Sequence, residues 1–262
     1  MTYSAHGIIL RRRDYGEHER LSTIYTREYG KIEAAAQGIR KIKSKLAGHT
    51  EPLTYGEFMF ANGRRTERLI QARTLQYFSS LREDLAVQMS AFFMAEAVDL
   101  LTRAGERDLR IFDLLLNTLT AADAGQKDTF SSVVKLLHLS GFGLSLDTCV
   151  SCKRGNSPAL AVDFVQGGVL CESCAQSAEQ GVSVSRAALD FFRVIFSSPV
   201  SALPLQNNSE ILSLELQRLA LLYLRAHAPY EPKVAKFFMQ EGTLFTQESP
   251  YLSGKTVMAP LN

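Results

Sequence analysis

The sequence predicts an α+β protein with more than one domain. Three features predict this class: short β-branched runs separated by glycine-containing turns up to about residue 80, apolar residues at helical intervals after Phe78, and two C-x-x-C pairs that interrupt the helical part. With 262 residues, of which 46% are hydrophobic, the chain can bury a sizeable core in each of two domains.

Five short strands are predicted in residues 1–80. They cover residues 4–13, 21–26, 31–37, 53–60 and 66–74. Between the last two, Asn62-Gly63 favours a two-residue type I′ hairpin turn, whose central residues both need positive φ. Five strands without a long helix predict a small closed or nearly closed barrel of the OB type, and a split SH3-like barrel is the main alternative.

Residues 81–262 are predicted to form an all-α domain. Gly105 and Gly125 separate its first helices, and a loop over 198–208 precedes the last. The predicted helices cover residues 81–103, 109–122, 129–139, 185–196 and 210–225. A turn-rich insertion over 145–178 interrupts this domain and contains every cysteine of the chain.

The cysteines predict one structural Zn²⁺ in this insertion. Cys149 and Cys152 form one C-x-x-C pair, and Cys171 and Cys174 form the second after 18 intervening residues. Each pair directs two thiolates at one point, so the two together supply a tetrahedral ligand set. Four thiolates leave no open position for water or substrate, which excludes a hydrolytic zinc.

Three other arrangements of the four cysteines compete with a zinc site. Two disulfides need an oxidising compartment. The sequence begins without an apolar signal segment, which favours a protein of the reducing cytosol. Four unrelated buried thiols would not be spaced in two equal pairs. An iron–sulfur cluster stays open, although two symmetric C-x-x-C turns favour zinc.

The positive charge is concentrated at the N-terminal end. The formal net charge is only +2, but residues 1–80 contain 14 Lys and Arg against 8 Asp and Glu, whereas the remainder contains 15 against 19. The predicted barrel is therefore the basic part of the protein, and a polyanion is its expected partner.

Basic clusters on the barrel predict a nucleic-acid-binding surface. The connection after the third strand is the densest, and on a small barrel such a loop borders the face that binds oligonucleotides. The candidate residues are Arg11, Arg12, Arg40, Lys41, Lys43, Lys45, Arg64 and Arg65. Aromatic residues lie in the same region, and we expect one or two of them on the binding face. The alternative is a set of solvated loops whose charge only keeps the protein soluble.

No catalytic constellation is found, so we expect a protein that is not an enzyme. The five histidines lie apart, without a carboxylate or nucleophile at a recurring spacing. No apolar run is long enough to cross a membrane, and no membrane partner is expected.

Several motifs, taken in order, resemble the RecO family of bacterial recombination mediators. They begin with Gly7–Leu10 and Asp14–Glu17 and continue through Gly30-Lys31-Ile32 after Thr26. The remaining matches are Gly38–Leu46 with Ser44 inside the basic loop, Pro52, the glycine-ended helix before Cys149, and Gly167–Cys171 before the second cysteine pair. The four-cysteine insertion is the most specific part of the resemblance.

The resemblance implies both a fold and a function. RecO-like proteins have an OB-fold, a helical domain and, in many members, a zinc lobe. They bind single- and double-stranded DNA, anneal complementary strands, bind RecR and help to load RecA onto DNA coated by single-stranded-DNA-binding protein. They also contact the acidic C-terminal tail of that protein, and they act in the bacterial cytoplasm, at the nucleoid during repair.

One segment departs from the family pattern, and other functions remain possible. Glu231–Lys236 lacks the basic, serine-containing character of the family's C-terminal segment, so residues that contact the acidic tail cannot be assigned. The alternative function is a zinc-stabilised protein-interaction scaffold that does not bind DNA. A metal-dependent nucleic-acid enzyme would need an open metal site or paired carboxylates, and neither is found.

Overall fold

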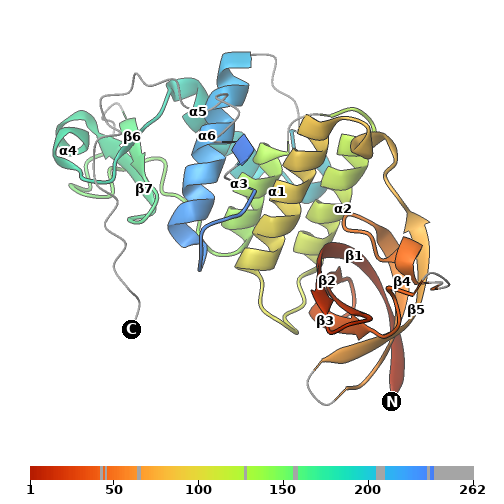
Figure 1. The fold of residues 1–262 in the computed structure, drawn as a ribbon. Helices are drawn as coiled ribbons and strands as arrows, with labels where there is room; N and C mark the ends of the chain where they lie inside the picture. The colour runs from red at the N-terminus through yellow and green to blue at the C-terminus, as the bar shows by residue number, and fades with distance from the viewer. Residues whose placement is uncertain are drawn as a thin grey trace.

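A computed structural model describes residues 1–41, 44, 46–63, 66–126, 129–155, 159–204, 210–234 and 237–238. Three parts follow one another in space: a β-barrel, a helical bundle and a small lobe at the far end of the bundle from the barrel (Figure 1). None of the helices within the described ranges is long and apolar enough to cross a membrane.

The N-terminal region is a closed five-stranded barrel, which confirms the OB-type prediction. The order around the barrel is β1-β2-β3-β5-β4, and a short parallel pairing of β3 with β5 at Ala34 and Ala35 closes it among antiparallel neighbours. A 3₁₀ turn, η1 (Ala47–His49), precedes β4. The strands are β1 (Thr2–Tyr15), β2 (Glu19–Thr26), β3 (Gly30–Ala36), β4 (Tyr55–Ala61) and β5 (Glu67–Gln76).

Every second side chain of a strand points into the barrel and fills its interior. In β4, buried and half-buried residues alternate along its whole length, so that Phe58 and Phe60 point inward. They pack against Ile9, Ile24 and Leu69 in one apolar cluster. The barrel therefore has its own apolar interior.

The connection between β4 and β5 differs from the predicted type I′ turn, so that prediction was wrong. A type I′ turn needs a positive φ at both central residues, and neither Asn62 nor Gly63 has one. Instead, a Cβ at Gly63 would lie 1.8 Å from the Thr66 carbonyl oxygen. Glycine is needed here for close approach of the backbone rather than for a left-handed conformation.

The helical domain begins after the turn η2 (Ser80–Arg82), and side-chain caps mark the starts of three of its helices, α1, α2 and α5. Asp84 accepts hydrogen bonds from the backbone N–H groups of Ala86 and Val87. The first helix therefore starts at Leu85, after this cap, and not at residue 81, where its apolar pattern begins. The helices are α1 (Leu85–Leu101), α2 (Leu109–Asp123), α3 (Phe130–Leu139), α5 (Arg186–Ser197) and α6 (Glu210–His227), with a 3₁₀ turn η3 (Val200–Ala202) after α5.

The cysteine-containing lobe is a three-stranded sheet with one short helix. β6 (Ala159–Asp163) lies between β7 (Gly168–Cys171) and β8 (Val182–Ser183), and α4 (Glu172–Ser177) follows β7 directly. One side of the lobe joins the bundle core, where the Phe164 ring stacks on Tyr223 at 4.7 Å between centroids. The other side faces the cysteines.

The barrel is packed firmly against the helical domain. Ile8, Leu10 and Tyr25, on its outer face, belong to the same apolar core as α1 and α2. At the edge of this contact, buried Asp99 of α1 accepts hydrogen bonds from Arg11 Nε at 2.5 Å and, through its backbone carbonyl, from Lys31 Nζ at 2.6 Å. The two domains therefore share one core that is bordered by charged contacts.

Candidate functional site

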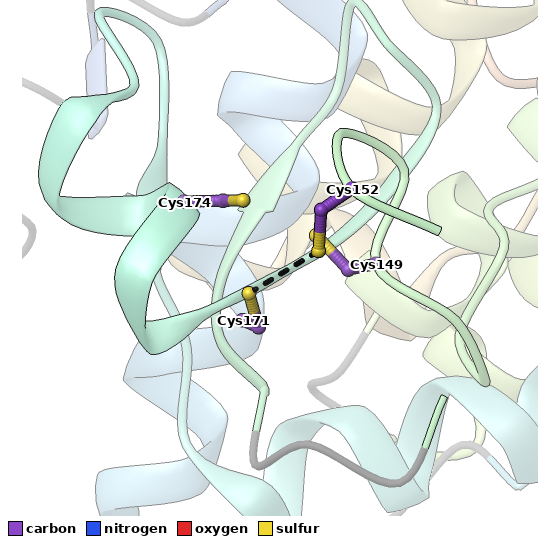
Figure 2. A group of neighbouring side chains, drawn as sticks. All are labelled: Cys149, Cys152, Cys171 and Cys174. Atoms are coloured by element: carbon purple, nitrogen blue, oxygen red, sulfur yellow. Dashed lines mark hydrogen bonds between the residues drawn. The ribbon is translucent and has the colours of Figure 1, made fainter. Parts of the chain in front are cut away.

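The four cysteine side chains converge on one point, as their spacing predicts. Each ligand atom lies within 4.8 Å of the other three. Figure 2 shows two side chains approaching from the loop before β6 and two from β7 and α4, with their sulfur atoms turned toward one another. Cys149 and Cys171 are buried, Cys174 is half-buried and Cys152 is exposed.

Backbone contacts fix the first cysteine pair against the second. Lys153 adopts a left-handed conformation with φ of 61° and donates its backbone N–H to the Cys149 carbonyl at 2.9 Å, which closes the turn. Val150 donates to the Val169 carbonyl, also at 2.9 Å. A Cβ at Gly168 would lie 2.4 Å from Val150 Cγ1, so only glycine lets β7 approach the turn this closely.

The donor set and its dimensions fit a zinc ion. Cys152 Sγ and Cys171 Sγ are 3.7 Å apart. Four ligands at about 2.3 Å from a tetrahedral Zn²⁺ would stand roughly 3.8 Å from one another. Burial alone would raise the pKa of Cys149, but backbone N–H groups of Cys152, Cys171 and Ser151 donate to its sulfur and lower that pKa to about 6. Such N–H donation stabilises the thiolate form that binds metal.

The candidate DNA-binding arginines that the structure describes make ion pairs or hydrogen bonds within the protein. Arg11 contacts Asp99 and lies 3.3 Å from Glu33, and Arg12 pairs with Glu51. Arg40 donates to the Glu17 backbone carbonyl at 3.2 Å and lies 3.7 Å from Asp14.

Lys41 is exposed beside Arg40, and among the described residues no carboxylate lies within ion-pair distance of its ammonium group. The other candidate residues, Lys43, Lys45, Arg64 and Arg65, lie outside the described residues.

The strand face that OB barrels commonly use for oligonucleotides is largely covered. Residues Leu21–Thr26 of β2 are all buried, so both faces of this strand are packed, one inside the barrel and one against the helical domain. Nucleic acid can reach the loops at the strand ends more easily than the strands themselves.

Comparison with protein families covers nearly the whole chain. The family description "Recombination protein O N terminal" matches residues 1–78, and "Recombination protein O C terminal" matches residues 82–234. The chain belongs to the RecO family. The first matched region corresponds to the barrel, and the second contains the helical bundle and the four-cysteine lobe.

Full-length relatives agree with this assignment. The DNA repair protein RecO of Rubrobacter xylanophilus is 34% identical over 87% of this chain and 92% of its own. That of Roseiflexus sp. is 32% identical over 97% and 91%. That of Pelotomaculum thermopropionicum is 28% identical over 92% and 94%. This RecO-family chain is thus similar to them from end to end.

Sequence reasoning missed the charged network that joins the two domains of this RecO-family chain. Asp99 lies in the apolar run Ala97-Val98-Asp99-Leu100-Leu101, and a lone carboxylate in such a run signals a partner from another element. That partner, Arg11, is 88 residues away, and no local pattern relates the two.

Proposed function

We propose that this protein is a DNA-binding recombination mediator in recombinational DNA repair. In this proposal it binds single- and double-stranded DNA and anneals complementary single strands without catalysing a reaction. Together with RecR, it helps to load RecA onto DNA coated by single-stranded-DNA-binding protein, whose acidic tail it contacts, in the bacterial cytoplasm. The observation that carries the proposal is the match of residues 1–78 and 82–234 to the RecO family, and the relatives' name, DNA repair protein RecO, supports it.

The loops of the barrel form the proposed DNA-binding surface. β2 is covered and Arg11 and Arg12 are paired, whereas Arg40 and Lys41 are exposed where the connection after β3 begins. Lysines on such a loop would contact phosphates without reading sequence. Binding should therefore depend strongly on salt and weakly on base composition.

The salt dependence of oligonucleotide binding tests this surface. Each phosphate contact adds a slope of about −0.7 to log affinity against log salt for single strands. Replacing Lys41, Lys43 and Lys45 together by Gln should flatten the slope by up to about 2 if all three contact phosphate. Replacing Lys153 and Arg154 is the control, because both belong to the lobe, and the lobe lies at the far end of the bundle from the barrel (Figure 1).

Two outcomes would count against the proposal. If the control variant loses affinity and slope while the loop variant keeps both, the lobe is the DNA site. If the unsubstituted protein does not shift a labelled oligonucleotide at low salt, the protein is better explained as a zinc-stabilised scaffold. The internal ion pairs of Arg11 and Arg12 are the observation that favours this second function.

We also propose that Cys149, Cys152, Cys171 and Cys174 hold one Zn²⁺. The convergence of four sulfurs and the 3.7 Å separation of two of them support the proposal. Bound there, the ion would hold the two cysteine turns together and have no open coordination position. Its role would be structural.

A further inference from the structure

A cavity of about 430 Å³ lies at the seam between the barrel and the helical domain. β1 supplies Leu10 and Arg13, α1 supplies Phe92, and the segment after α6 supplies Tyr230 and Val234. Leu10 is buried, and Phe92 and Val234 are half-buried, so the cavity has an apolar floor. Its size suits one small planar group.

The charges around this cavity are unbalanced toward positive. Two carboxylates line it, but both are already used: Asp99 by Arg11 and Lys31, and Glu96 by the backbone N–H groups of Lys233 and Val234 at 2.8 and 2.9 Å. Arg13 and Lys233 also line the cavity and are exposed. Within the part of the chain that the structure describes, neither has a carboxylate at ion-pair distance. The Arg13 guanidinium lies 5.8 Å from the centroid of the Tyr15 ring, so its described partner is an aromatic face and not a carboxylate. Among the described residues, two cations without a carboxylate partner therefore line the cavity.

The exposed aromatic ring at the cavity adds a stacking surface. Tyr230 is 52% exposed although it lies between charged neighbours of both domains. An apolar floor, an accessible ring and two cations without a carboxylate partner together match a nucleotide, which offers a π-face for stacking and a phosphate for the cations.

The cavity is also linked to the proposed DNA-binding loop. Asp14 follows Arg13 in β1 and lies 3.7 Å from Arg40, the residue at which the basic loop begins. Arg13 and Arg40 therefore both lie near the end of β1, beside the Asp14 carboxylate, which pairs with Arg20 and Arg40. This shared position of basic side chains favours a polyanion such as nucleic acid over a peptide as the occupant.

We propose that this seam cavity binds one nucleotide of single-stranded DNA. The base would lie against Leu10, Phe92 and Tyr230, and the phosphate would lie between Arg13 and Lys233. The proposal rests on the proposed DNA-binding function and adds the helical domain to the DNA path. It also gives α1 and the segment after α6 a direct role in holding DNA.

Photo-crosslinking of the full-length protein tests the position of the base. A (dT)₂₀ oligonucleotide in which 5-iododeoxyuridine replaces several thymidines crosslinks on irradiation to an aromatic side chain stacked on it. We expect mass spectrometry to find the crosslink on Tyr230, and no crosslink there when unlabelled (dT)₂₀ is in excess. Crosslinks confined to other tyrosines would overturn the proposal.

Charge removal tests the phosphate contacts. The double variant Arg13→Gln, Lys233→Gln should bind fluorescein-labelled (dT)₂₀ about tenfold more weakly, which corresponds to about 1.4 kcal/mol. Its salt slope should flatten by roughly 0.7 for the one phosphate. The control, Arg103→Gln with Arg186→Gln, removes the same charge from exposed sites after α1 and on α5 and should leave both the affinity and the salt slope unchanged. The variant Arg13→Lys, Lys233→Arg should restore binding.

The outcomes separate this inference from the proposed function. If the unsubstituted protein binds (dT)₂₀ and the Gln variant binds it equally well, the cavity proposal fails and DNA binding stands. If the unsubstituted protein does not bind (dT)₂₀, the proposed function itself fails. A labelled peptide of alternating Glu and Leu serves as the second probe. If the Gln substitutions weaken binding of this peptide but not of the oligonucleotide, the cavity is a protein-binding site instead.

Discussion

Lys135 shows how one buried cation stabilises a helix end in the bundle. Its side chain is only 5% exposed, and Nζ donates to the carbonyl oxygens of Ile195, Phe196 and Ser198 at 3.0, 2.9 and 2.7 Å. These are among the last carbonyls of α5, which have no partner within the helix, and they carry the negative end of its dipole. A lysine is thus buried without a carboxylate because backbone oxygens take that role.

Lys135→Met should destabilise the protein strongly. Methionine has a similar length but leaves the three carbonyls without a donor, so we expect a loss of about 3 kcal/mol in the free energy of unfolding. Urea denaturation at neutral pH measures this. Lys153→Met, at an exposed position, is the control and should change the free energy by less than about 0.5 kcal/mol. Equal effects of the two substitutions would contradict this account.

Two histidines should make the helical domain sensitive to acid. His138 stacks on Phe196 at 4.5 Å, and His227 stacks on Phe142 at 4.2 Å. Burial lowers the pKa of both below the ordinary 6.5, and nearby Lys135 lowers that of His138 further. As the pH falls through about 6.5, the unfolded chain takes up protons before the folded one does, so stability is lost below that pH.

The double variant His138→Phe, His227→Phe tests this pH dependence. It keeps an aromatic ring at both positions and removes the titrating groups, so the unfolding free energy should fall less steeply between pH 7 and 5 than in the unsubstituted protein. Urea denaturation at several pH values gives the slope. His18→Gln, at an exposed position, is the control and should reproduce the original slope. A double variant with an unchanged slope would exclude the two histidines as its cause.

At the scale of elements, the barrel behaves as part of a larger core. β2 is buried on both faces, and no charged residue occurs between Leu21 and Thr26. The turn into β3 fits closely against the helical domain, since Gly30 has φ of 68° and a Cβ there would lie 2.1 Å from the Glu106 carbonyl oxygen. The backbone N–H of Gly105 donates to the Lys31 carbonyl at 3.0 Å in the same contact.

Gly30→Ala should therefore loosen the domain contact. Gly16→Ala is a matched control, because Gly16 has φ of 70° but nothing lies within 4 Å of its Cβ position. Gly16→Ala should lower the free energy of unfolding by only about 1–2 kcal/mol, the cost of placing a Cβ on a left-handed backbone. Gly30→Ala adds a clash with backbone and should cost about 3 kcal/mol or more. Thermal denaturation of both variants checks the difference, and equal melting temperatures would argue against a tight contact.

Local patterns in the sequence predict the elements well and their contacts poorly. The turn signals around residues 14–17 and 28–30 and the helical spacing of Phe93, Ala97 and Leu100 predict strands and helices that the structure contains. The two C-x-x-C pairs predict the cluster because each pair is close in sequence. The type I′ turn was wrong because strand ends depend on partner strands, and α4 and β8 are too short to show a pattern.

At the scale of the molecule, the metal centre and the proposed DNA surface lie at opposite ends of the helical bundle (Figure 1). The lobe has a small apolar core beside the cysteines, in which Cys149 and Cys171 pack with Ala161 and Leu170. So few apolar residues supply little stability. A structural zinc in small modules contributes on the order of 10 to 16 kcal/mol of apparent free energy, which is enough to hold such a lobe.

Loss of the metal should therefore unfold the lobe and spare the barrel. We expect one zinc per chain by elemental analysis of protein purified without added zinc, and less than one in Cys171→Ser. Limited proteolysis of that variant should cut first between residues 145 and 183, because the sheet of β6, β7 and β8 loses the link that joins it to the first cysteine turn. Binding of (dT)₂₀ should stay within about twofold, since phosphate contacts on the barrel set the salt-dependent affinity.

Ser151→Ala is the matched control, because Ser151 lies inside the first pair and is exposed. It should keep the zinc and resist protease. A metal-free protein with an intact lobe would mean that contacts such as Phe164 on Tyr223 hold the lobe alone. Loss of DNA binding in Cys171→Ser, with the barrel still folded, would instead place part of the DNA path on the lobe.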